Sequence, residues 1–265
     1  MTSTRPTYKS PPITECLFDI RVSLPAKINE ADLRELAKSI ALDYPDMQPQ
    51  RMFEGQFRID SNDGSSNASA IDLGVNGYIS WSKEKNQAVQ FRLDGFTYNR
   101  LEPYTGWDSC FVEAFKFWQV YQRKIIPTSI ASLAVRYINT IKIPFKQFVL
   151  SDYLTGMDER VNTLQEVAAQ EPEVKQIFEG AFMEAFLYQD TVRLPSKNIK
   201  VVKTRTIGPN SSKSETPIIL DIETIKSLGN PLEDGQIKDI FNELHDIKNV
   251  VFEQCITDKT RGLFQ

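Results

Sequence analysis

The sequence predicts an α+β fold of two pseudo-repeated β-α-β-β-β-α units, each with an antiparallel sheet packed on a long helix in a helix-grip-like arrangement. Three observations predict it. Strand-like and helix-like segments follow the same order in both halves, each opening strand ends in a proline (Pro25 and Pro144), and each half closes with a long amphipathic helix. The 265 residues accommodate two fused halves, because single cores stop growing near about 250 to 300 residues. We expect a first unit over 13–127 and a second over 128–265 that together form one compact body.

The first half opens with a polar, proline-containing lead over 1–12, which we expect to be flexible. From Ile13 to Pro25 apolar and polar residues alternate, as in a half-buried strand. Asn29 is the expected N-cap of a helix that ends near Leu42.

Three further strands and a long helix complete the first half. The strands are expected over 52–59, 70–81 and 88–98. The helix begins near Tyr104 and ends before Pro127, and its apolar stripe is expected to pack on the sheet. That stripe contains Trp107, Phe111, Ala114, Phe115, Trp118, Tyr121 and Ile125.

The second half repeats this order with a longer insertion. Its opening strand runs over 132–144, and we expect it to pair with the opening strand of the first half. A short helix at 148–154 begins an acidic, partly helical insertion over about 146–180. The remaining elements are strands at 181–189, 198–206 and 217–225, and a helix over about 233–259.

Composition excludes several classes of protein. The 31 Lys and Arg against 35 Asp and Glu give a net charge of −4, which argues against a general nucleic-acid binder. Cys16, Cys110 and Cys255 show no Cys-x-x-Cys spacing, so we expect buried free thiols in a reducing compartment. No signal-peptide core and no run of roughly 18 apolar residues is present. We therefore expect a cytoplasmic protein without membrane association.

The segment Pro11-Pro12-Ile13-Thr14-Glu15-Cys16-Leu17-Phe18-Asp19-Ile20-Arg21 is similar to the N-terminal signature of a sporadically distributed bacterial family of uncharacterised proteins. Later segments extend the resemblance: 104–118, 135–139 and 244–258. Patchy occurrence is typical of accessory genes on mobile elements. The resemblance thus implies an accessory role, such as phage defence or a toxin–antitoxin system, and it supplies no catalytic residues to carry over.

The polar residues of the two opening strands are the candidate site residues. If the strands are neighbours, their carboxylates and guanidinium groups would meet where the halves join. Such pairs either hold the halves together or bind a ligand or anion. The candidates are Glu15, Asp19, Arg21, Arg136 and Asn139.

No motif for catalysis, metal or cofactor is present. His245 is the single histidine, and no Gly-x-Ser-x-Gly turn accompanies it. The acidic pair Asp221 and Glu223 lacks His or Cys at ligand spacing. No glycine-rich phosphate loop occurs. We expect no cofactor, no metal and no recognisable catalytic residue.

One basic stretch offers a contact for nucleic acid. Lys203 and Arg205 would share one face of a strand and Lys200 the other. An edge strand protected from aggregation by its lysines is the simpler interpretation.

Two hypotheses about function follow. The first is a non-catalytic binding or interaction protein whose partner is another protein. The alternative is a hydrolase or phosphate-processing enzyme with a site where the halves join. Homodimer formation and nucleic-acid binding remain open as further interactions.

Overall fold

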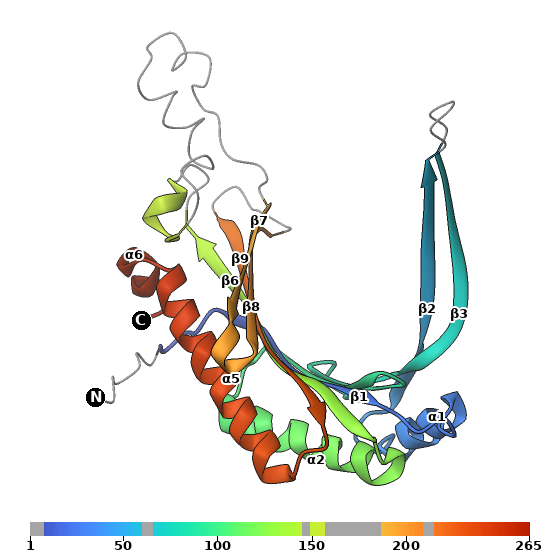
Figure 1. Ribbon diagram of the computed structural model, residues 1–265. Coiled ribbons are helices and arrows are strands. Elements are labelled where there is room, and N and C mark those ends of the chain that lie inside the picture. The colour runs from blue at the N-terminus through green and yellow to red at the C-terminus, as the bar shows by residue number, and fades with distance from the viewer. Residues whose placement is uncertain (1–7, 60–65, 145–148, 157–186, 209–214) are drawn as a thin grey trace. The chain divides into compact units, whose positions relative to one another are not determined.

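The computed structural model describes residues 8–59, 66–144, 149–156, 187–208 and 215–265. Its strands form one nine-stranded antiparallel sheet in the order β2-β3-β4-β5-β1-β6-β9-β8-β7. The strands are β1 Ile13–Ser23, β2 Asp46–Ile59, β3 Ser66–Trp81, β4 Gln87–Arg92, β5 Gly95–Leu101, β6 Ser129–Ile143, β7 Leu187–Leu194, β8 Ile199–Ile207 and β9 Thr216–Asn230 (Figure 1).

The prediction of two pseudo-repeated units, each with its own sheet on a long helix, is wrong because the strands of both halves belong to one sheet. The coarser α+β class is correct. A strand at a sheet edge leaves a row of unpaired N–H and C=O groups, so a shared sheet removes two edges that separate sheets would expose. The opening strands β1 and β6 are neighbours in the strand order, as expected.

In the described ranges, four α-helices and two 3₁₀ turns accompany the sheet. They are α1 Glu30–Ser39, α2 Trp107–Ile125, α5 Asp234–Cys255 and α6 Asp258–Gly262, with 3₁₀ turns at Leu150–Asp152 and Pro195–Lys197. None of the helices in the described ranges is long and apolar enough to span a membrane.

The chain forms two compact units, each assembled from segments that are distant in sequence. We call Leu17–Leu133 with Ser227–Ile237 the N-terminal unit. The C-terminal unit comprises Met1–Cys16, Ala134–Lys226 and Lys238–Gln265.

The N-terminal unit contains a hairpin where we expected one strand over 88–98. The chain turns at Leu93–Asp94, between the end of β4 at Arg92 and the start of β5 at Gly95. Gly95 has φ +153°, and a Cβ there would lie 2.2 Å from the carbonyl oxygen of Ile20. Only glycine fits such a close approach to β1. An Asp-Gly dipeptide between apolar runs is a strong hairpin signal, so the sequence contained the information.

Helix α2 buries most of the predicted stripe. Trp107 and Phe115 are only half-buried, whereas Phe117, which the prediction left out, is buried. The Tyr121 hydroxyl donates to the carbonyl oxygen of Arg92 at 2.9 Å and so fixes the helix to β4. The buried residues of α2 are Cys110, Phe111, Ala114, Phe117, Trp118, Tyr121 and Ile125.

The other predicted helices differ from the structure mainly at their ends. Helix α1 begins after Asn29, whose Oδ1 accepts a hydrogen bond from the backbone N–H of Ala31 at 2.9 Å, which confirms the N-cap. The helix expected over 233–259 is divided into α5 and α6, and Thr257 caps the second. Residues 157–186, which hold most of the predicted insertion, lie outside the described residues.

Within the lead predicted over 1–12, two residues hydrogen-bond the C-terminal part of the chain. The Tyr8 hydroxyl donates to Glu253, and the backbone N–H of Ser10 donates to the carbonyl oxygen of Phe264 at 3.0 Å.

All three cysteines are buried and form no disulfide, which confirms the prediction of buried free thiols.

Candidate functional site

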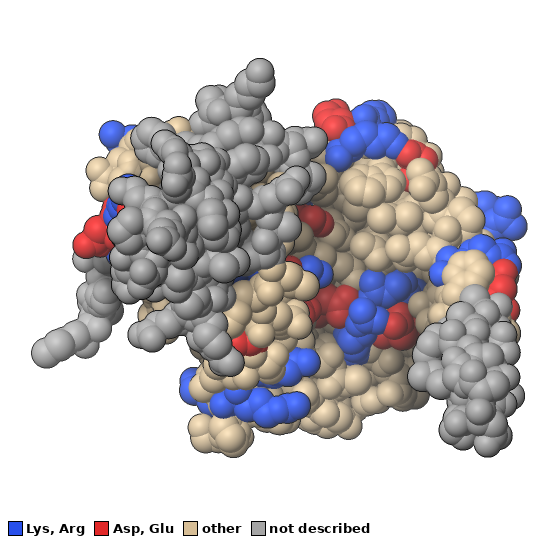
Figure 2. Space-filling model, turned by 90° about the horizontal axis from the view of Figure 1, so that it is seen from above, with Lys and Arg blue, Asp and Glu red and all other residues tan. Residues whose placement is uncertain are grey.

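The candidate site lies on the face of the N-terminal unit's strands that points away from α2. Along β1, Phe18 and Ile20 are buried against the helix, so the alternation of the strand sends Asp19 and Arg21 to the opposite face. In the open central part of the surface seen from this side, acidic and basic residues lie next to one another (Figure 2).

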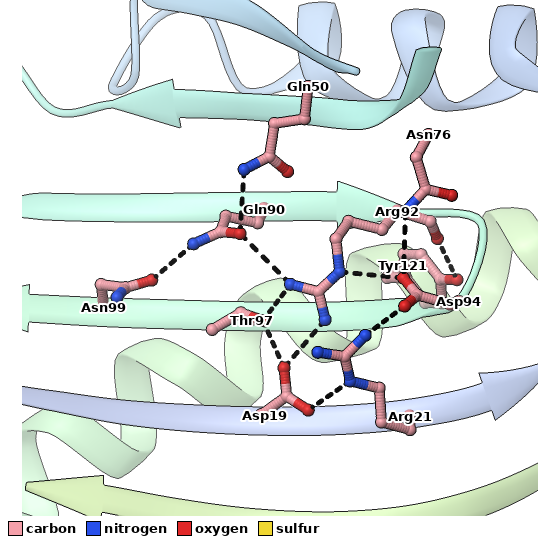
Figure 3. Close-up of polar contacts among 10 residues, drawn as sticks. All are labelled: Asp19, Arg21, Gln50, Asn76, Gln90, Arg92, Asp94, Thr97, Asn99 and Tyr121. Carbon is pink, nitrogen blue, oxygen red and sulfur yellow. Dashed lines mark hydrogen bonds and ion pairs between the residues drawn. The ribbon is translucent and has the colours of Figure 1, made fainter. Parts of the chain in front are cut away.

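Asp19 is the centre of a hydrogen-bonded network across β4, β5 and β1 (Figure 3). Its Oδ1 accepts from Arg92 Nη2 at 2.8 Å and from the Thr97 hydroxyl at 2.5 Å. Its Oδ2 accepts from Arg21 Nε at 2.9 Å. One carboxylate therefore ties three neighbouring strands together through their side chains.

Asp94, in the turn between β4 and β5, is the second carboxylate of the network. Its Oδ1 accepts from Arg92 Nε at 3.0 Å and from Asn76 Nδ2 at 3.4 Å, and its Oδ2 accepts from Arg21 Nη1. We call Asp19, Arg21, Arg92 and Asp94 the Arg–Asp network. Two positive and two negative charges make it neutral overall.

Arg92 is the buried member of this network. Its side chain is only 10 % exposed, against 43 % for Arg21. Gly77 lies opposite Arg92 on β3, and a Cβ there would lie 2.8 Å from Arg92 Cα and 2.3 Å from the carbonyl oxygen of Phe91. The glycine thus leaves the space that Arg92 occupies.

The electrostatic environment favours the ionised forms of Arg92 and Asp94. Burial alone lowers the pKa of Arg92, but attraction and hydrogen bonding to Asp19 and then Asp94 outweigh it and raise the pKa. Burial likewise raises the pKa of Asp94, but attraction to Arg92 and Arg21 is stronger and lowers it. A carboxylate with a lowered pKa is a weak proton acceptor, so Asp94 is poorly suited to act as a general base.

A chain of amide side chains continues the polar face away from the network. Gln90 Oε1 accepts from Arg92 Nη1 and from Gln50 Nε2, both at 3.2 Å. Gln90 Nε2 donates to Asn99 Oδ1 at 3.0 Å. These contacts extend the polar face from β1 to β2 (Figure 3).

The predicted candidates of the C-terminal unit have other partners. Arg136 Nη2 donates to Asp221 Oδ2 at 2.6 Å, and its Nε lies 3.0 Å from Oδ1. This hydrogen bond is the main reason that the pKa of Arg136 is raised, and the charges of Asp221, Glu223 and Glu15 add to it. Arg21 and Arg136 thus each have a carboxylate partner within their own unit.

Asn139 does not share a face with Arg136. It is buried, and its Nδ2 donates to the carbonyl oxygen of Leu220 at 2.9 Å. The alternation of β6 places positions three apart on opposite faces, so Asn139 belongs to the core of its unit.

The basic stretch of β8 is also divided between two faces. Lys203 and Arg205 pair in register with Ile222 and Leu220, whose side chains are buried, whereas Lys200 pairs with Ile225 on the other face. Arg205 is 1 % exposed and contacts Asp190 at 3.1 Å, and Lys203 contacts the same carboxylate at 2.9 Å.

Sequence reasoning missed Arg92, Asp94 and Thr97, which complete the site. The Asp94–Gly95 turn signal would have revealed the hairpin and placed Arg92 and Thr97 on adjacent strands. His245 lies near Asn249 at 3.2 Å and outside this site. Within the described ranges, no group of three His, Cys, Asp or Glu could hold a metal ion.

No family model matches the chain, and no curated protein matches it either.

Proposed function

We propose that the protein is a non-catalytic binding protein that presents the Arg–Asp network face of its N-terminal unit to another protein. The observation that carries the proposal is that the charged groups of this face are bonded to one another while part of the network is open to solvent. Arg21 and Asp94 each expose 43 % of their side chains, and Arg21 Nη2 has no hydrogen-bond partner among the described residues.

Such a face supports recognition better than chemistry. A general base needs a carboxylate that accepts a proton readily, whereas Asp94 has a lowered pKa. A phosphate site needs uncompensated cations, whereas each arginine of the network contacts two aspartates. The alternative of a hydrolase or phosphate-processing enzyme therefore has less support than binding.

The partner that fits this face has polar groups of both signs. A neutral network attracts neither polyanions nor polycations at long range, so affinity would come from short-range hydrogen bonds to exposed members such as Arg21 and Asp94. A folded protein surface provides such mixed groups, whereas nucleic acid provides mainly phosphates.

The biological setting of the proposal comes from the family resemblance of the sequence. It favours a cytoplasmic accessory component of a bacterial defence or toxin–antitoxin type system. The partner would then be another protein encoded by the same accessory system.

The test compares retention of host proteins by the immobilised wild type and by Arg21→Ala. Arg34 of α1 is exposed and lies outside the network, so Arg34→Ala is the matched control. We expect Arg21→Ala to lose a protein that wild type and Arg34→Ala retain, while its melting temperature stays close to that of wild type. Equal retention by all three proteins would count against the proposal.

A further inference from the structure

The outer part of β2 and β3 forms a two-stranded ribbon. β3 pairs with β4 only along Gly77–Trp81, whereas it pairs with β2 along its whole length. We call Arg51–Ile59 of β2 and Ser66–Val75 of β3 the ribbon arm. Among the described residues, these two segments pair only with each other. The arm extends beyond the other strands of its unit (Figure 1).

Two irregularities in the pairing mark the start of the arm. The register shifts between Gln50 and Arg51 and again between Met52 and Phe53, so β3 carries an extra residue at each point. Gly74, between these points, has φ +90°. Bulges bend a strand and increase its twist, which explains why the arm departs from the sheet here.

The arm exposes large apolar side chains on both faces. Phe53 is 60 % exposed, and Met52, its neighbour on β2, points to the opposite face. Ile71 and Leu73 of β3 are also exposed. A two-stranded hairpin is at best marginally stable in water, and exposed apolar groups this close together mark an interaction surface.

β2 is the terminal strand of the sheet, and β3 of the arm pairs only with β2, so neither edge of the arm has a neighbouring strand among the described residues. Pro49 lacks an N–H group and blunts the β2 edge next to the sheet. Farther along the arm, Gln50–Glu54 contains no proline. Only the charged side chains of Arg51 and Glu54 protect the β2 edge there, beside the exposed Met52 and Phe53.

We propose that β2 of the arm pairs antiparallel with β2 of a second copy of this chain, about a twofold axis at Phe53. In this register Phe53 lies opposite its own copy, Met52 opposite Glu54 and Arg51 opposite Gly55, so no like charges face each other directly. Aromatic pairs across strands are favourable, and a four-stranded sheet replaces a marginal ribbon. A twofold interface is closed, so the product is a dimer rather than a fibre.

This inference is independent of the proposed function, because the arm shares no residue with the Arg–Asp network. The proposal names a second copy of this chain as the partner of the β2 edge. If the arm instead binds a different protein, the purified protein will have the mass of a monomer.

The first test measures the mass of the purified protein by light scattering at up to about 100 µM, which detects a dimer of micromolar Kd. We expect a dimer for wild type and a monomer for Phe53→Lys. Val112 of α2 is 66 % exposed, so Val112→Lys is the matched control and should remain dimeric. A monomeric wild type, or a dimer unaffected by Phe53→Lys, overturns the proposal.

The second test determines the register by disulfide cross-linking. Directly opposed residues of antiparallel strands have Cα atoms about 4.5 to 5.5 Å apart, within the range of a disulfide, whereas diagonal neighbours are about 7 to 8 Å apart. Phe53→Cys should therefore cross-link at least about tenfold more than Met52→Cys or than Leu42→Cys, an exposed control. The native cysteines are buried and should not interfere. Equal cross-linking at the three positions overturns this register.

Discussion

Arg92 of β4 donates a hydrogen bond from Nη2 to Oδ1 of Asp19 on β1 at 2.8 Å, across the intervening strand β5. Thr97 of β5 donates to the same oxygen, so the contact joins three strands. The strength of this connection follows from the burial of Arg92, whose charge has little access to water.

Removing Arg92 should destabilise the protein far more than removing Arg21. Arg92→Ala leaves Asp19 and Asp94 without their most buried partner, and we expect a loss of about 2 to 4 kcal/mol in the free energy of unfolding. Arg21 is more exposed and is screened by solvent, so Arg21→Ala should cost less than about 1 kcal/mol. Urea denaturation at pH 7 measures both, and equal losses would show that burial does not govern the network.

Gly77 should tolerate no side chain. The Cβ of Gly77→Ala would meet the backbone of Phe91 and Arg92, which cannot move without disturbing the β3–β4 pairing. We expect a loss of about 2 kcal/mol or more. Gly229→Ala is the control, since no atom lies within 4 Å of the added Cβ, and its effect should stay within about 0.5 kcal/mol. Thermal and urea unfolding compare the two variants.

Asp94 should make the stability depend on acid pH. Its pKa in the folded protein lies below the ordinary value of 3.8, so its contribution is present above that pH and is lost as the pH falls through the folded pKa. Asp94→Asn cannot ionise. The difference in unfolding free energy between wild type and Asp94→Asn should therefore shrink as the pH is lowered from about 7 to about 3. A difference that is constant with pH would contradict this assignment.

The Tyr8 hydroxyl should hold the described N-terminal residues to the C-terminal helices. It donates to Glu253 at 2.8 Å, and burial followed by this contact raises the pKa of Tyr8 to about 12. Tyr8→Phe keeps the ring contact with Phe264 and removes the hydroxyl, at a cost of about 1 kcal/mol. We expect faster hydrogen exchange at the Ser10 amide in this variant.

The high pKa of Tyr8 also fixes the direction of a pH effect. The neutral hydroxyl is favoured in the folded protein, so its contribution is complete below the ordinary pKa of 10 and is lost as the pH rises towards 12. Wild type should lose its advantage over Tyr8→Phe in this range. An unchanged Ser10 exchange rate in Tyr8→Phe would show that the aromatic contacts alone hold this segment.

Local signals in the sequence predicted local structure well. The alternation of β1 separated Phe18 and Ile20 from Asp19 and Arg21, because successive side chains of a strand point to opposite faces. Asn29 marked the start of α1, because its side chain satisfies a free N–H group at the helix terminus. Asp94–Gly95 carried an equally local signal, and the hairpin there was predictable in principle.

The sequence by itself determined where most strands and helices lie, which faces of β1 and α2 are apolar and that Asp19 and Arg21 share one face. Only the tertiary structure decided that nine strands form one sheet, that Arg92 and Asp94 complete the network and that Arg205 is buried. The physical reason is that strand order and register depend on pairing between segments distant in the chain, and each edge can pair with many partners. The spacing of apolar residues identifies a strand and its two faces. The packing of the whole sheet determines which strands lie next to it.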